Sequence, residues 1–74
     1  MNASLGIDAL EKAIKYVGSQ EALAKRINSN QQTISWWLNK SGKVPAEKAI
    51  AIETATDKTV TRQQLRPDLF QISQ

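Results

Sequence analysis

The chain has 74 residues, a formal net charge of +3 at neutral pH, and neither cysteine nor histidine. This length suits one domain with a small core, so residues 1–74 are interpreted as a single domain. The missing cysteines exclude disulfides and thiolate metal sites. The missing histidines remove the commonest general base and metal ligand. We therefore expect no enzyme activity, no catalytic residues, no metal and no cofactor.

Hydropathy also argues against a membrane role. No apolar run approaches the roughly 20 residues that span a bilayer. Residues 1–12 lack the basic start and the continuous apolar stretch of a signal peptide. The sequence thus predicts a cytoplasmic protein with no membrane partner.

The first predicted helix begins near residue 8. Asp8 and Glu11 have the spacing of a capping box, which predicts Asp8 as the N-cap. Gly18 is a natural stop for this helix, and Ser19 is a natural cap for the next one. Apolar residues recur between them at spacings of three and four, the pattern of a core-facing stripe: Ile7, Leu10, Ile14 and Val17.

Residues 20–39 predict two short helices joined by a tight polar turn. The second helix should cover about residues 20–27 and bury Leu23, Ala24 and Ile27. Residues 28–30, Asn-Ser-Asn, have turn composition, and asparagine tolerates the left-handed backbone conformation better than most residues. The third helix should run from about residue 31 to residue 39.

The third helix sorts into two faces at about 100° of rotation per residue. With Ile34 placed inward, Trp37 and Leu38 fall on the same side. The two adjacent tryptophans therefore separate, with Trp37 in the core and Trp36 outward. The outward side carries Gln32, Trp36 and Asn39, flanked by Ser35 and Lys40.

An outward face of amides suits the recognition of base edges. Lys and Glu would serve solubility better, whereas Gln and Asn can make two hydrogen bonds to adenine. Two short helices with such a face on the second one predict a helix-turn-helix, whose second helix lies in the DNA major groove. The same amides also suit an ordinary solvated surface, and an outward tryptophan also suits a protein contact.

Charge along the chain agrees with contact to phosphates. The 25 positions between Glu21 and Glu47 hold no acidic residue and four basic ones, Lys25, Arg26, Lys40 and Lys43. A locally basic, acid-free interval favours nucleic-acid backbone contact. The alternative is a slightly basic solvated face.

The rest of the chain predicts two more helices and a tail. Pro45 is placed at the first position of a fourth helix, which should fade near residues 56–58. Thr61 can cap a last short helix, which should end near Arg66 because the following proline disfavours helix. No segment shows sustained alternation, so an all-α fold is expected. The tail, residues 67–74, holds Leu69, Phe70 and Ile72.

Residues 20–39 resemble the helix-turn-helix of phage Cro and repressor proteins. Ala24 stands where that motif has a small residue, and its buried positions match Leu23, Ile27, Ile34 and Trp37. The runs 44–56 and 60–70 resemble the YdaS/Cro-like group of small prophage regulators, some of which are labelled antitoxins. The resemblance implies a compact five-helix, lambda-repressor-like domain. It also implies a homodimer on a near-palindromic double-stranded DNA operator, in the nucleoid of a bacterial or phage-infected cell.

The resemblance also carries site residues to this chain. Base contacts are expected from the start and outward face of the third helix: Asn30, Gln31, Gln32, Ser35 and Trp36. Phosphate contacts are expected from Gln20, Asn39, Lys40, Ser41 and Lys43. We expect the apolar tail residues Leu69, Phe70 and Ile72 to help dimerisation, with packing on their own core as the alternative.

A second interpretation comes from another class of function. The antitoxin label favours a protein-binding module that neutralises a toxin partner. Neutralisation of this kind would use an apolar surface and would survive the loss of Gln31 and Gln32. The first interpretation is a sequence-specific repressor of prophage type, which acts by occupying a promoter.

Overall fold

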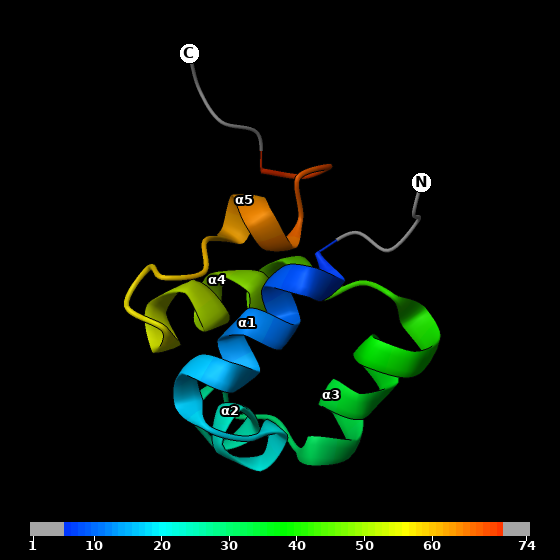
Figure 1. Ribbon diagram of the computed structural model, residues 1–74. Coiled ribbons are helices and arrows are strands. Elements are labelled where there is room, and N and C mark those ends of the chain that lie inside the picture. The colour runs from blue at the N-terminus through cyan, green and yellow to red at the C-terminus, as the bar shows by residue number, and fades with distance from the viewer. Residues whose placement is uncertain (1–5, 71–74) are drawn as a thin grey trace.

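Five α-helices and one π-helical turn make up residues 6–70, the part of the chain that the computed structural model describes (Figure 1). No strand occurs within this range, so the predicted all-α, five-helix fold is confirmed. The elements are α1 (Ile7–Val17), α2 (Gln20–Arg26), α3 (Gln31–Trp36), η1 (Trp37–Ser41), α4 (Ala46–Ala55) and α5 (Arg62–Leu65).

Two of the predicted N-caps are present. The Ser19 hydroxyl accepts a hydrogen bond from the Ala22 amide at 3.1 Å and begins α2. Thr61 begins α5 with a complete capping box, in which its hydroxyl accepts from the Gln64 amide and the Gln64 side chain accepts from the Thr61 amide. Each cap satisfies backbone donors that have no partner within the first helical turn.

The predicted Asp8 cap is wrong. The cap position of α1 is Gly6, which has a left-handed φ of 79° and makes no side-chain cap, while Asp8 lies inside the first turn. A Cβ atom on Gly6 would lie 2.1 Å from the backbone oxygen of Leu65. Close packing of the chain against α5 therefore fixes where α1 begins, and only glycine fits there.

The helix that follows the turn is longer than expected and changes geometry. Its α-helical part ends at Trp36, and η1 continues it to Ser41. The Gly42 amide donates to the Trp37 carbonyl at 2.9 Å, which is the wider i to i+5 spacing of a π-helical turn. Gly42 then ends the run in the left-handed conformation, with φ 71°. Pro45 is the N-cap of α4, whereas the sequence placed it at the first helical position, so α4 begins one residue later than expected.

The core draws on every element and confirms the expected burial of the helix-turn-helix residues. Leu10 and Ala13 of α1 are fully buried, whereas Ile7, Ile14 and Val17 pack at its edge. The buried apolar residues are Leu10, Ala13, Leu23, Ala24, Ile27, Ile34, Trp37, Val44, Ala49, Ile52, Val60 and Leu65.

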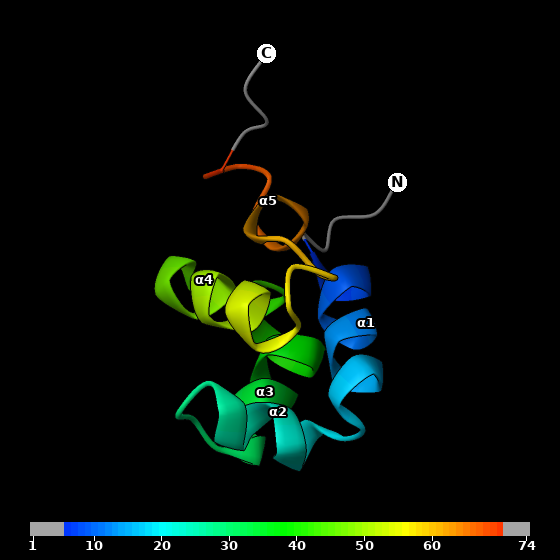
Figure 2. The same cartoon turned by 90° about the vertical axis from the view of Figure 1, so that its left-hand side faces the viewer.

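The helices place α2 and α3 at the end of the molecule opposite α5 (Figures 1 and 2). Helix α1 packs against both α2 and α5, and α4 does the same from its own side. The two ends of the fold are thereby held at a fixed separation. Within residues 6–70, no helix combines the length and the apolar character that a membrane crossing needs.

Candidate nucleic-acid interface

The turn between α2 and α3 is closed by backbone hydrogen bonds. Asn28 has a left-handed φ of 59°, the conformation that its residue type tolerates. The Ser29 amide donates to the Ala24 carbonyl at 2.8 Å, and the Asn28 amide donates to the Lys25 carbonyl at 3.4 Å. These two bonds form a Schellman motif, which stops α2 and turns the chain into α3.

Asn30 begins α3 as its N-cap. Its Oδ1 accepts from the Thr33 amide at 2.8 Å and from the Thr33 hydroxyl at 3.0 Å. A bidentate contact with adenine needs both the oxygen and the nitrogen of an amide. While this cap is intact, Asn30 retains only its Nδ2 as a donor toward an outside partner.

The outward face of α3 and η1 comprises Gln31, Gln32, Ser35, Trp36 and Asn39. Gln31 and Gln32 are exposed, and their amides make no hydrogen bond within residues 6–70. Trp36 is 57% exposed and Trp37 only 4%, so the predicted separation of the two tryptophans is confirmed. Two free amides and one indole thus stand together at the surface.

Ser35 and Asn39 are coupled to each other. The Asn39 Nδ2 donates to the Ser35 hydroxyl at 3.1 Å, one helical turn away. Ser35 is partly buried, whereas Asn39 is exposed. The pair can present a fixed hydroxyl and an amide oxygen to a partner.

The loop after η1 has an internal brace. The Ser41 hydroxyl donates to the Lys43 carbonyl at 2.9 Å and accepts from the Lys43 amide at 3.2 Å. These bonds direct the Ser41 hydroxyl into the loop. Lys40 and Lys43 are exposed, and within residues 6–70 neither makes a salt bridge.

The remaining predicted site residues are dispersed. Gln20 is the first residue of α2 and is partly buried. Leu69 is 51% exposed, whereas Phe70 packs against the core with the Arg62 guanidinium 5.7 Å from its ring centroid. Phe70 thus has an intramolecular partner, and Ile72 lies outside the described residues.

Arg66 is a residue that the sequence reasoning missed. Its Nε and Nη2 donate to the two carboxylate oxygens of Asp68 at 2.9 and 2.7 Å, and its Nη1 donates to the Val44 carbonyl at 2.9 Å. The side chain thereby ties the start of the tail to the loop that carries Lys43. Hydrogen bonds from Arg66 lower the pKa of the Asp68 carboxyl, and the charge of Lys43 adds to this effect.

Lys48 is the second missed residue. Its Nζ donates to the Ile27 carbonyl at 2.9 Å and to the Asn28 carbonyl at 3.4 Å, both at the end of α2. No local pattern signals either contact, because Lys48 lies about twenty residues further along the chain. The sequence marked it only as a charged residue of the fourth helix.

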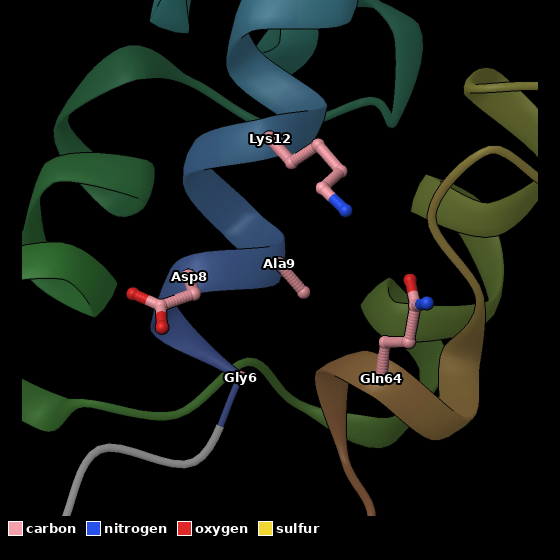
Figure 3. A pocket seen from close by; sticks show the side chains of 5 residues that line it. All are labelled: Gly6, Asp8, Ala9, Lys12 and Gln64. Atoms are coloured by element: carbon pink, nitrogen blue, oxygen red, sulfur yellow. The ribbon is translucent and has the colours of Figure 1, made fainter. Parts of the chain in front are cut away.

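A shallow pocket lies at the other end of the molecule, between the start of α1 and α5. It is lined by Gly6, Asp8, Ala9, Lys12 and Gln64, and the Asp8 carboxylate and the Lys12 ammonium point in different directions (Figure 3). These side chains do not form a nucleophile–base pair. Among residues 6–70, no three acidic residues gather to hold a metal ion.

Comparison with known proteins agrees with this architecture. Residues 10–73 match a family described as bacterial toxin YdaS. A candidate transcriptional regulator of Escherichia coli K12, also named YdaS, is 33% identical over 61 residues. The match covers 82% of this chain and 62% of that relative, so the chain spans less than two thirds of the relative's length.

A solved structure extends the comparison to the fold. The Cro protein of a candidate prophage element, Xfaso 1, in Xylella fastidiosa strain Ann-1 superposes with a TM-score of 0.81 at 42% sequence identity. The match covers 86% of this chain and 97% of the Cro chain. By its sequence match over residues 10–73, and in agreement with this fold, the chain belongs to the YdaS family.

Proposed function

We propose that the chain acts as a single sequence-specific DNA-binding domain, a Cro-like transcriptional repressor of prophage type. The observation that carries this proposal is the outward face of α3 and η1, with Gln31 and Gln32 unengaged beside the exposed Trp36. The turn and caps described above hold this face rigidly. The names of the regulator from E. coli and of the Cro protein from X. fastidiosa support the same function.

In this proposal, the helix formed by residues 31–39 enters the major groove of a near-palindromic operator. Gln31 and Gln32 discriminate bases, because both the oxygen and the nitrogen of each side-chain amide are available for hydrogen bonds. Ser35 contributes a hydroxyl held by Asn39, and Trp36 presses on a sugar or a thymine methyl group. Asn30 contributes through Nδ2, because its oxygen caps α3.

Contacts to phosphates set the register on the duplex. Lys40 and Lys43 supply charge from exposed positions, and Gln20 and Asn39 supply amide groups. Ser41 acts through its brace on the Lys43 backbone, so its contribution to phosphate binding is indirect. Residues 22–46, which supply most of these contacts, contain no carboxylate that would repel a phosphate.

Selection of bound duplexes from random DNA tests the proposal. The expected result is a two-fold symmetric consensus with half-sites about one helical turn apart, which also implies a dimer on DNA. Gln32→Ala should weaken binding to the selected duplex by about 1–3 kcal/mol and relax preference at one base pair. Failure of the wild-type protein to enrich any sequence would overturn the proposal.

Lys43→Ala separates charge from base reading. It should weaken binding to selected and scrambled duplexes alike, and lower the slope of log affinity against log salt by about one unit. Lys12→Ala removes the same charge at a position on α1 outside the proposed DNA contacts and is the matched control. A full salt slope in Lys43→Ala would remove this lysine from the phosphate contacts.

A second candidate is an antitoxin-type protein-binding module that neutralises a toxin partner; the family description, which names a toxin, links the family to toxin systems. The exposed Leu69 side chain offers apolar surface for such a contact. Replacing both Gln31 and Gln32 by alanine distinguishes the two functions in cells. An effect on growth that survives this double substitution would favour the protein partner, and its loss would favour DNA binding.

A further inference from the structure

Lys48 occupies an unusual place in its own helix. It is the third residue of α4 (Ala46–Ala55), within the first turn. The N-terminal end of a helix carries partial positive charge, so a lysine there is unfavourable for α4 alone. A partner outside α4 can offset this cost.

That partner is the C-terminal end of α2, against which α4 packs (Figure 2). The Ile27 and Asn28 carbonyls are the last ones of α2 and of its left-handed turn. Lys48 Nζ lies 2.9 Å from the first oxygen and 3.4 Å from the second. The ammonium thus meets the negative end of the α2 dipole and satisfies acceptors that the Schellman bonds leave open.

The contact fixes the segment on which the outward face depends. Asn28 is followed after one residue by Asn30, the N-cap of α3. The chain between the two caps is too short to absorb a movement of the turn. A shift of the Ile27 and Asn28 carbonyls would therefore displace the start of α3, where Gln31 and Gln32 lie.

We propose that Lys48 is a positioning residue for base recognition: it anchors the turn to α4 and so sets the pose of α3 in the groove. The inference rests on the proposed DNA-binding function. Lys48 itself contacts no base. Its ammonium is directed at backbone carbonyls within the protein, unlike the exposed Lys40 and Lys43.

Lys48→Met tests this role, because methionine retains much of the apolar stem and removes the ammonium. The probes are the duplex selected by the wild-type protein and a scrambled duplex of the same length. The ratio of the two affinities should fall by about ten-fold or more, because hydrogen bonds from a charged group are strong. Lys12→Met, a lysine on α1 with no hydrogen bond within residues 6–70, should leave the ratio unchanged.

Two readouts separate positioning from other roles. Equal weakening of both duplexes, with a salt slope lower by about one unit, would show a phosphate contact and overturn the proposal. An unchanged ratio in Lys48→Met, measured well below its melting temperature, would also overturn it. Lys48→Arg keeps a charged donor and should restore most of the lost discrimination.

Hydrogen exchange on the free protein tests the anchoring without DNA. In Lys48→Met, the Ser29 and Thr33 amides should exchange faster by about an order of magnitude, while the Leu10 amide keeps its relative protection. Unchanged exchange at Ser29 would overturn the anchoring. If the wild-type protein shows no DNA preference but the turn still loosens, the proposed function fails and Lys48 is shown to anchor the turn alone.

Discussion

Replacing Asn30 separates two roles that converge on one side chain. Its Oδ1 caps α3 through the Thr33 amide at 2.8 Å, while its Nδ2 remains available for DNA. Asn30→Ala removes both groups. Loss of an N-cap costs about 1 kcal/mol, which in a domain of this size lowers the melting temperature by about 4–8 °C.

Asn30→Ser removes only the amide. Serine caps helices about as well as asparagine, so the melting temperature should change by no more than about 2 °C, corresponding to a few tenths of a kcal/mol. If Nδ2 contacts a base, this variant should still lose discrimination at one base pair. Asn30→Ala should lose that discrimination together with stability.

Thermal unfolding by circular dichroism and titration of selected and scrambled duplexes measure the two losses. Ser19→Ala is the matched control, because it removes the cap of α2 outside the expected base-reading residues. It should lower the melting temperature and leave base preference intact. Equal melting temperatures for Asn30→Ala and Asn30→Ser, both well below that of the wild type, would refute the capping argument. Unchanged base preference in Asn30→Ser would show that Asn30 does not contact a base.

Four further substitutions test the fold. In urea unfolding, Trp37→Ala should lower the free energy of unfolding by about 3–5 kcal/mol, because Trp37 is only 4% exposed. Trp36→Ala should change it by no more than about 0.5 kcal/mol. Equal losses in the two variants would contradict the placement of Trp37 in the core and Trp36 at the surface. Gly6→Ala should lower the free energy of unfolding by more than about 1 kcal/mol, because φ is 79° and the new Cβ would meet the backbone of α5. An unaffected urea midpoint would count against that close approach. Hydrogen bonds from Arg66 lower the pKa of Asp68, so the ionised carboxylate stabilises the fold. Asp68→Asn should therefore be less stable than wild type above the ordinary carboxyl pKa of 3.8, and this difference should disappear as pH falls below that value. A difference in stability that persists in acid would argue against this ion pair.

Local pattern predicted much of the fold. Rotation at about 100° per residue placed Trp36 and Trp37 on opposite sides. The prediction is confirmed because Ile34 defines the inward side only three residues earlier, and the π-helical turn begins no sooner than Trp37. Ser19 and Thr61 were predicted as caps because a cap depends on only three or four consecutive residues.

Contacts between distant segments defeated the same reasoning. Asp8 has the spacing of a cap, yet α1 begins earlier because Gly6 packs against the backbone of Leu65, far away in sequence. The bonds from Lys48 to the turn and from Arg66 to the Val44 carbonyl also join segments about twenty residues apart. Such contacts depend on how the helices pack, which periodicity does not specify.

Within the candidate site, the sequence identified exposed polar residues but not their internal bonds. Gln32 is exposed, as its side of the helix suggested, and Gln31, expected as a contact from its place at the start of the helix, is exposed too. Asn30 was predicted as a base contact and Ser41 as a phosphate contact, yet both have side-chain oxygens engaged by nearby backbone. Side-chain hydrogen bonds over two or three residues compete with outside partners, and composition alone does not show which prevails.

The separation between bonded and unbonded amides bears on how such a protein could evolve. The side-chain amides of Gln31 and Gln32 make no hydrogen bond within residues 6–70, so substitutions there leave the caps and core unchanged. Asn30, one residue earlier, holds the start of α3. Under the proposed function, a descendant could acquire a new target sequence by drift at the two glutamines without passing through an unstable ancestor, whereas change at Asn30 would be confined to the few residues that can cap a helix.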